Sequence, residues 1–169
     1  MEKPKLVISD IDGVWTDGGM YYDQTGNEWK KFNTSDSAGV LFLRILDIPF
    51  AILSGEDTAI VKRRAKKLNT ELVFLGIKNK LETATELCKK LGIDLKEVAF
   101  IGDDLNDLGL FAHVGFSAAP ANAPDYIKSR VDYVTKLKGG EGAFREFVEH
   151  LVGQHSSMDF VLSKYLESE

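Results

Sequence analysis

Cysteine, basic charge and long apolar runs are all scarce in this chain. Cys88 is the sole cysteine, so no disulfide can form within the chain, and its helix-forming neighbours predict a small buried side chain. The formal net charge of −5 and the pI near 5.3 exclude a general affinity for nucleic acid or anionic membranes. No stretch approaches the roughly 18 apolar residues of a membrane span, and no signal peptide is evident. We therefore expect a cytoplasmic protein with a small-molecule partner.

The chain has the length of one domain. Its 169 residues, 44% of them hydrophobic, suffice for one well-packed core and are too few for two ordinary domains. No repeat, low-complexity run or linker divides them. We predict a single domain over residues 1–153, followed by a C-terminal segment, residues 154–169, that contains a short amphipathic helix.

Short β-rich apolar runs alternate with longer amphipathic stretches along the chain, a pattern typical of a parallel sheet covered by helices. The expected strands are residues 5–9, 49–53, 71–75, 97–101, 114–118 and 131–135. The expected helices are residues 35–47, 56–68, 79–91, 105–111, 122–128 and 141–152. The predicted fold class is α/β, with a doubly wound, mostly parallel, Rossmann-like sheet.

Residues 14–33 interrupt this alternation. Two strand-like stretches, "GMYYD" and "EWKKF", flank the turn residues "QTGN", which predicts a β-hairpin between the first strand and the first helix. The insert is too short to be a domain of its own. Its aromatic side chains need a surface to cover.

Polar side chains cluster where the predicted strands end. Asp10 and Asp12 follow the first strand, "SG" at 54–55 follows the second, "GDDLND" at 102–107 follows the fourth, and Lys80 opens the helix after the third. Singly, each reads as an ordinary turn, helix cap or solvated lysine. Ligands of open parallel sheets collect beyond the carboxyl ends of the strands. Because all four clusters fall at that edge, together they predict an active site.

This set of residues suits phosphoryl chemistry on Mg²⁺. Asp10, Asp103 and the backbone carbonyl of Asp12 offer the oxygen ligands that Mg²⁺ prefers. Backbone amides, a hydroxyl group and an ammonium group would donate to the oxygens of a bound phosphoryl group. The expected phosphate contacts are Gly13, Ser54, Gly55 and Lys80. Asp10 could then attack phosphorus as a nucleophile, and Asp12 could protonate the leaving alkoxide and deprotonate the attacking water.

The elements "DIDG", "SG", Lys80 and "GDDLND", in this order, resemble the motifs of the haloacid dehalogenase superfamily of phosphohydrolases over about residues 5–150. The small hairpin, "DGVWTDGG" and "KGGEGAFRE" are similar to its capless branch, which contains the phosphatases of 3-deoxy-D-manno-octulosonate 8-phosphate (KDO 8-phosphate). "GNEWKKFNTSDSAG" and "GEDTAIVKRRAKKL" most resemble the phosphatases of the nine-carbon 2-keto-3-deoxy-D-glycero-D-galacto-nononate 9-phosphate (KDN 9-phosphate).

The resemblance implies roles for further residues. Asp104 and Asp107 would hold metal-bound waters or Lys80. It also implies a cytoplasmic homotetramer in which a neighbour completes each active site, with the aromatic hairpin at the interface. Glu56 would meet the sugar in its own subunit. Arg64 and Lys67, three apart on one helix face, would reach a neighbour's site and bind the substrate carboxylate.

Several other readings stay open. KDO 8-phosphate and N-acetylneuraminate 9-phosphate are alternative substrates to KDN 9-phosphate. A phospho-accepting receiver domain has a similar strand-end Asp, Ser or Thr and Lys, but has no use for Asp12 as an acid/base group. A catalytically idle oligomerisation module would not need the full set of motifs, and no companion domain accompanies them here.

Overall fold

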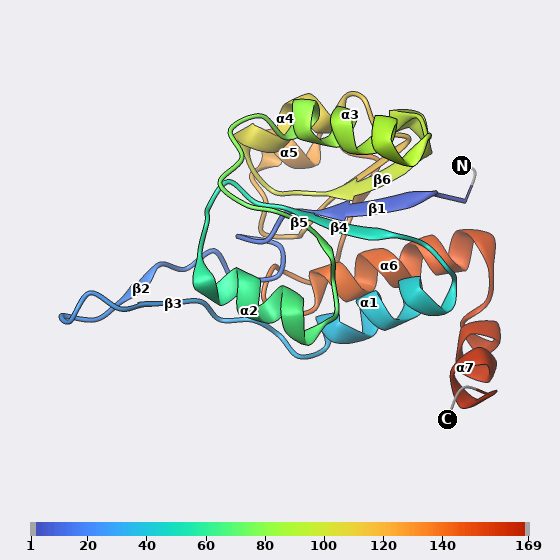
Figure 1. The fold of residues 1–169 in the computed structure, drawn as a ribbon, viewed down its shortest axis with the longest axis horizontal. Helices are drawn as coiled ribbons and strands as arrows, with labels where there is room; N and C mark the ends of the chain where they lie inside the picture. The colour runs from blue at the N-terminus through green and yellow to red at the C-terminus, as the bar shows by residue number, and fades with distance from the viewer. Residues whose placement is uncertain (1–2, 168–169) are drawn as a thin grey trace.

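Six parallel strands form the central sheet of the computed structural model, which describes residues 3–167 (Figure 1). The strands are β1 (Leu6–Ser9), β4 (Phe50–Leu53), β5 (Leu72–Phe74), β6 (Val98–Ile101), β7 (Phe116–Ala119) and β8 (Tyr133–Val134). Their spatial order is β5-β4-β1-β6-β7-β8, and each neighbouring pair is parallel. The order reverses at β1, which confirms the predicted doubly wound α/β fold.

Helices cover both faces of this sheet (Figure 1). The α-helices are α1 (Asp36–Ile45), α2 (Ala59–Lys67), α3 (Lys80–Leu91), α4 (Leu108–Phe111), α5 (Asp125–Lys128), α6 (Ala143–His155) and α7 (Met158–Glu167). Two 3₁₀ helices span Leu95–Glu97 and Leu105–Asp107. α1, α2 and α6 lie on one face, and α3, α4 and α5 lie on the other. None of the helices within residues 3–167 is long and apolar enough to cross a membrane.

The buried strands alternate their side chains between two cores. In β1, Val7 packs into the cluster that includes α1 and α6, whereas Leu6 and Ile8 pack into the cluster that includes α3 and α4. Cys88 is buried in the second cluster, as its position predicts. The C-terminal segment also contributes: α6 runs through the predicted boundary at residue 153, and Val161 of α7 is fully buried in the first cluster.

Two predicted helices begin later than the apolar pattern indicates. The stretch predicted to be helical from residue 56 starts at Ala59, because Thr58 has extended backbone angles and its hydroxyl accepts from the amide of Val61. The helix predicted from residue 122 starts at Asp125, after the extended Pro124. Residues 105–111 divide into a 3₁₀ turn and the short α4.

The predicted hairpin is present and projects from the body of the molecule (Figure 1). β2 (Tyr21–Tyr22) and β3 (Glu28–Trp29) pair antiparallel. Tyr21, Tyr22 and Trp29 are exposed, so most of the hairpin's aromatic surface is uncovered in one chain. Phe32 is partly buried against the main core, and Trp15 is fully buried and stacks on Phe144 with 4.4 Å between ring centroids. Its indole belongs to the main core, which corrects the expectation that it covers another surface.

Candidate active site

Asp10 stands at the centre of the polar cluster beyond the end of β1. It is only 5% exposed, and one of its carboxylate oxygens lies 2.9 Å from the Lys80 ammonium. Burial raises the pKa of Asp10 to about 7, because the nearby charge of Lys80 only partly offsets the loss of hydration. The backbone carbonyl of Asp10 accepts from the Ser9 hydroxyl, which itself accepts from the Trp15 indole. The core beneath the site thus fixes the backbone of Asp10.

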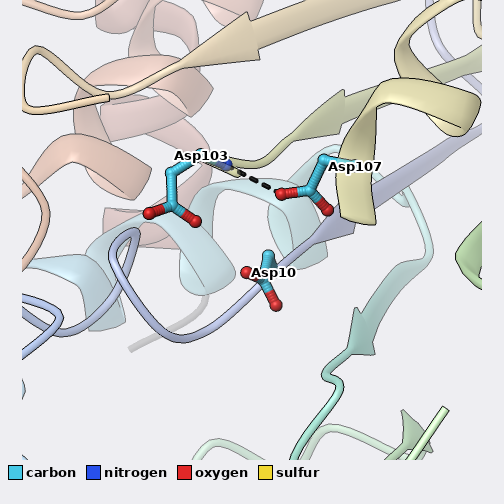
Figure 2. Close-up of side chains that lie close together, drawn as sticks. All are labelled: Asp10, Asp103 and Asp107. Atoms are coloured by element: carbon cyan, nitrogen blue, oxygen red, sulfur yellow. Dashed lines mark hydrogen bonds between the residues drawn. The ribbon is translucent and has the colours of Figure 1, made fainter. Parts of the chain in front are cut away.

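The second carboxylate of the cluster is Asp103, which follows β6 and faces Asp10 (Figure 2). Burial, followed by the charges of Asp10 and Asp107, raises the pKa of Asp103 to about 8. Carboxylates from Asp10, Asp103 and Asp107 present oxygens within 4.8 Å of one another. The carboxylates of Asp10 and Asp103 lie close together, and they fit a hard divalent cation such as Mg²⁺, which stabilises their ionised forms.

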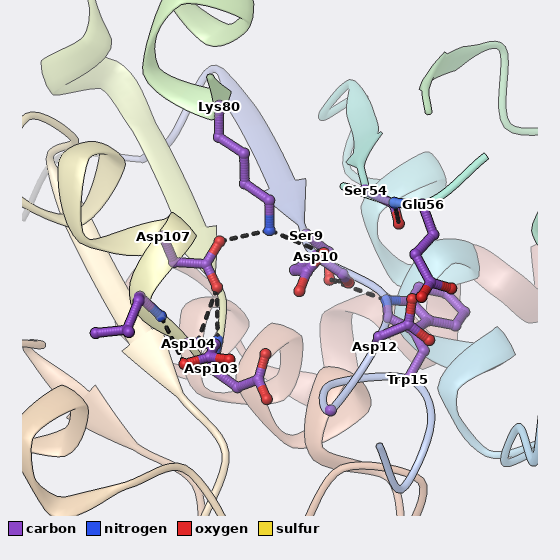
Figure 3. A network of polar contacts seen from close by, with 12 residues as sticks. Ser9, Asp10, Asp12, Trp15, Ser54, Glu56, Lys80, Asp103, Asp104 and Asp107 are labelled. Atoms are coloured by element: carbon purple, nitrogen blue, oxygen red, sulfur yellow. Dashed lines mark hydrogen bonds and ion pairs between the residues drawn. The ribbon is translucent and has the colours of Figure 1, made fainter. Parts of the chain in front are cut away.

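Asp107 has its oxygens already occupied by protein donors. One oxygen accepts from Lys80 at 2.5 Å, and the other accepts from the amides of Asp103 and Asp104 at 2.8 and 3.1 Å (Figure 3). A Cβ at Gly102 would lie 2.4 Å from the Asp107 carboxyl carbon, so this packing requires glycine. Asp107 therefore holds Lys80 and the loop, and Asp10 and Asp103 remain the candidate metal carboxylates, with the Asp12 carbonyl as a predicted third ligand.

Asp104 lies at the exposed rim of the same loop. Its side chain accepts from the Leu105 amide at 2.7 Å and caps the 3₁₀ helix Leu105–Asp107. The role predicted for it, holding waters of the metal, stays a prediction. Its described contacts are those of a helix cap.

The predicted phosphate contacts border the same cluster. Ser54 is buried directly after β4, and its hydroxyl accepts from the Glu56 amide. Lys80 is buried at the first position of α3, where Asp10 and Asp107 outweigh the effect of burial and raise its pKa. Gly13 has φ +81°, and a Cβ there would lie 1.8 Å from an Asp103 oxygen. Gly55 is different: a Cβ would make only ordinary contacts, the nearest at 3.6 Å.

Lys30 is the functional residue that the sequence analysis missed. Its ammonium lies 2.5 Å from an Asp12 oxygen and 2.6 Å from a Glu56 oxygen, and its side chain is only 2% exposed. The strand-like "EWKKF" carries the signal, since alternation along a strand sends neighbouring lysines to opposite faces. Lys30 thereby brings the Glu56 carboxylate close to Asp12, and the role predicted for Glu56 beside the leaving group stays a prediction.

No described contact brings Arg64 or Lys67 to the cluster of Asp10, Asp103 and Asp107, and the carboxylate that attracts the Arg64 guanidinium is the buried Asp36. The Arg64 guanidinium donates to the Asn33 carbonyl and the Ser37 hydroxyl, and it lies 6.0 Å from the Trp15 ring centroid. Lys67 is exposed at the last position of α2. Arg64 thus ties α2 to the start of α1, and the prediction that either residue binds substrate remains a prediction.

Comparison with known proteins identifies the family of this chain. Residues 47–146 match the haloacid dehalogenase-like hydrolases. The chain is 43% identical over 152 residues to the KDO 8-phosphate phosphatase of Haemophilus influenzae. These residues are 90% of this chain and 84% of that protein. The chain belongs to this hydrolase family. It is an enzyme of the phosphatase type.

Solved structures agree with this assignment. The KDO 8-phosphate phosphatase of Moraxella catarrhalis, solved with a magnesium ion, a phosphate ion and KDO, is 35% identical, with a TM-score of 0.92 and coverage of 97% of this chain and 94% of that chain. A probable YrbI family phosphatase from Pseudomonas syringae pv. phaseolica is 40% identical, with a TM-score of 0.93 and coverage of 98% and 94%. The Haemophilus influenzae and Moraxella catarrhalis relatives are both named KDO 8-phosphate phosphatases, and the resemblance to the nine-carbon enzymes stays a prediction.

We expect Mg²⁺ binding to the phosphatase to release protons at low pH. The ligands must be ionised, and Asp10 and Asp103 have pKa values raised to about 7 and about 8, so affinity falls as the pH falls through this range. Calorimetric titrations in buffers of different ionisation enthalpy should give nearly two protons per Mg²⁺ at about pH 6 and almost none at about pH 9.5. Release that does not change with pH would contradict the assignment of these two ligands.

Gly13→Ala is expected to lower kcat/KM at least about tenfold and to weaken Mg²⁺ binding, because the new methyl group displaces Asp103. The matched control is Gly92→Ala, which has a similar φ of +68° and open space around the new Cβ. The control should lose about 1–2 kcal/mol of stability and keep its activity. Steady-state kinetics and thermal unfolding separate the two effects, and equal activity losses would refute the steric account.

Proposed function

We propose that the protein is a Mg²⁺-dependent phosphatase of KDO 8-phosphate that works through an aspartyl phosphate on Asp10. The observation that carries the substrate assignment is the 43% identity with the Haemophilus influenzae KDO 8-phosphate phosphatase over 90% of this chain. The chemistry is supported by the cluster of Asp10, Asp103, Lys80 and Ser54 at one edge of the sheet. Residue identity and geometry thus favour the same reaction.

In the proposed reaction, the ionised Asp10 attacks phosphorus and the bond to the leaving alkoxide breaks. Lys80, the Ser54 hydroxyl and the amide of the Gly13 loop hold the phosphoryl oxygens and keep phosphorus in line with the Asp10 oxygen. Bound Mg²⁺, held by Asp10, Asp103 and the Asp12 carbonyl, would neutralise phosphoryl charge. Asp107 keeps the Lys80 ammonium beside Asp10.

Asp12 moves the protons in this scheme. Its carboxyl group donates a proton to the leaving alkoxide oxygen and then takes one from the water that hydrolyses the aspartyl phosphate. Asp12 lies two residues after the nucleophile, and its Oδ1 accepts from Lys30, which also donates to Glu56. The proposal puts the leaving group on this side of Asp12. One residue therefore serves both half-reactions.

A phosphate-release assay over a panel of sugar phosphates tests the substrate. We expect kcat/KM with Mg²⁺ to be at least about tenfold higher for KDO 8-phosphate than for KDN 9-phosphate, N-acetylneuraminate 9-phosphate or glucose 6-phosphate, a difference of about 1.4 kcal/mol in transition-state binding. A preference for a nine-carbon substrate, or for none of the panel, would reject KDO 8-phosphate without rejecting the phosphatase.

KDN 9-phosphate is the second candidate substrate. It is favoured by the position of Glu56, which stands beside Asp12 and could accept hydrogen bonds from sugar hydroxyl groups. If the panel selects nine carbons, Glu56→Ala should reduce the ratio of nine-carbon to eight-carbon kcat/KM. The factor should correspond to about 1.5–3 kcal/mol of transition-state binding, the scale of a lost charged hydrogen bond. An unchanged ratio would exclude Glu56 as the residue that selects chain length.

We also propose a homotetramer with the hairpin at its interface. Tyr21, Tyr22 and Trp29 expose adjacent aromatic surface that one chain leaves uncovered, and such patches mark association sites. In that assembly Lys67, exposed at the end of α2, is better placed to reach a neighbour's substrate than Arg64, which its own chain engages. Light scattering should give a mass four times that of the chain, and a fully active monomer would remove the proposal.

A further inference from the structure

The Lys30 ammonium lies among three carboxylates that come from separate parts of the chain. Its Nζ is 2.5 Å from Asp12 Oδ1, 2.6 Å from Glu56 Oε2 and 3.8 Å from Glu28 Oε1. The contacts with Asp12 and Glu56 are charge-assisted hydrogen bonds, which are about twice as strong as neutral ones, whereas Glu28 lies beyond hydrogen-bond distance. The Lys30 side chain is only 2% exposed, whereas the Asp12 and Glu56 side chains are 33% and 43% exposed, so water reaches the carboxylate side of both pairs.

These contacts connect the hairpin to the ends of two neighbouring strands, at one edge of the central sheet. Lys30 directly follows β3, Asp12 lies in the loop after β1, and Glu56 lies in the loop after β4. Figure 3 shows the Glu56 side chain extending toward Asp12. The hairpin thereby contributes one side chain, that of Lys30, directly to the edge of the active site.

Lys30 provides the short contact that orients the Asp12 carboxylate. The other described donor to that carboxylate is the Thr16 hydroxyl, at 3.5 Å, which is the outer limit of a hydrogen bond. The Asp12 side chain is one-third exposed and therefore not held by packing alone. Without Lys30, the charges of Asp12 and Glu56 would repel each other, and the Asp12 side chain would lose its main restraint.

On the basis of the proposed phosphatase reaction, we propose that Lys30 is a positioning residue that holds the Asp12 carboxyl group toward the leaving-group oxygen and ties it to Glu56. Asp12 gives and takes the proton at Oδ2, while its Oδ1 accepts from the Lys30 ammonium whether or not Oδ2 carries the proton, so Lys30 acts through its placement. General acid catalysis needs hydrogen-bonding distance to the leaving oxygen, and a displacement of about 1 Å can lower a rate about 100-fold.

The test compares a poor and a good leaving group. For Lys30→Met we expect kcat/KM to fall about 10- to 100-fold on the best alkyl phosphate of the substrate panel, mainly through kcat. On para-nitrophenyl phosphate, whose phenolate leaves without a proton, the fall should stay within about threefold. The matched control is Lys31→Met, since Lys31 is the next residue and its side chain is 60% exposed and 3.7 Å from Asp17. It should keep wild-type rates on both substrates.

A second measurement separates positioning from a loss of folding. If Lys30 acts through Asp12, Lys30→Met should change kcat on the alkyl phosphate by less than about threefold in the Asp12→Asn background. Equal losses of Lys30→Met on both substrates, or full additivity with Asp12→Asn, would overturn the proposal. A wild-type enzyme without phosphatase activity would instead reject the proposed function, so the two failures are distinct.

Discussion

Replacing Asp10 by asparagine is expected to lower phosphate release at least about 10⁴-fold, because the amide removes the nucleophile and one ionised metal ligand together. Asparagine has nearly the same shape as aspartate, so the buried site above Trp15 and Ser9 should stay packed. Steady-state phosphate release measures the loss. Circular dichroism and thermal unfolding should give a folded protein.

The matched control for this variant is Asp36→Asn. Asp36 is another fully buried aspartate, at the start of α1, and burial raises its pKa to about 6. Its carboxylate accepts a hydrogen bond from the Arg145 amide, and the side-chain carbonyl of an asparagine can accept the same bond. Asp36→Asn should therefore keep kcat/KM within about threefold of wild type. Comparable losses in the two variants would mean that burying a neutral amide, rather than losing a nucleophile, impairs the enzyme.

Replacing Asp12 by asparagine should lower kcat/KM on alkyl phosphates roughly 10²–10⁴-fold, the usual contribution of a general acid or base. The backbone carbonyl remains, so Mg²⁺ affinity should stay near that of the wild type. With para-nitrophenyl phosphate the loss in kcat/KM should be much smaller, because this parameter covers only steps up to departure of the leaving group. The aspartyl phosphate should then accumulate, since its hydrolysis lacks a general base.

Two results would contradict this role of Asp12. Near wild-type turnover of an alkyl phosphate by Asp12→Asn would exclude proton donation by the carboxyl group. Equal losses on both substrates, together with weakened Mg²⁺ binding measured by calorimetry, would instead indicate that Asp12 supports the metal through its side chain.

The sheet and its catalytic edge were predictable because burial leaves a clear mark on sequence. β1 and β6 are fully buried, so each reads as a continuous apolar run, and the first acid after each run marks the strand end. Parallel pairing of β1 with β4 and β6 then brings Asp10, Ser54 and Asp103 to one edge. Topology does this whatever the details of the loops.

Contacts made by long side chains were not predictable in this way. The spacing on α2 shows that Arg64 and Lys67 lie on one face of the helix, but it does not show what that face contacts. In the structure, Arg64 reaches across to Asn33 and Ser37. Lys30 presents the same difficulty, because its partners Asp12 and Glu56 are 18 and 26 residues away along the chain. Such pairings depend on the angle at which the hairpin leaves the sheet, which no local pattern encodes.

Trapping the aspartyl phosphate tests the central claim most directly. Asp12→Asn enzyme would be mixed with Mg²⁺ and para-nitrophenyl phosphate, quenched with borohydride, which reduces an acyl phosphate to an alcohol, and digested for peptide mass spectrometry. The account predicts that Asp10 is converted to homoserine, only with substrate present and not in the Asp10→Asn, Asp12→Asn double variant. Conversion of a different carboxylate, or of none while the Asp12→Asn enzyme releases a stoichiometric burst of para-nitrophenol, would contradict Asp10 as the nucleophile.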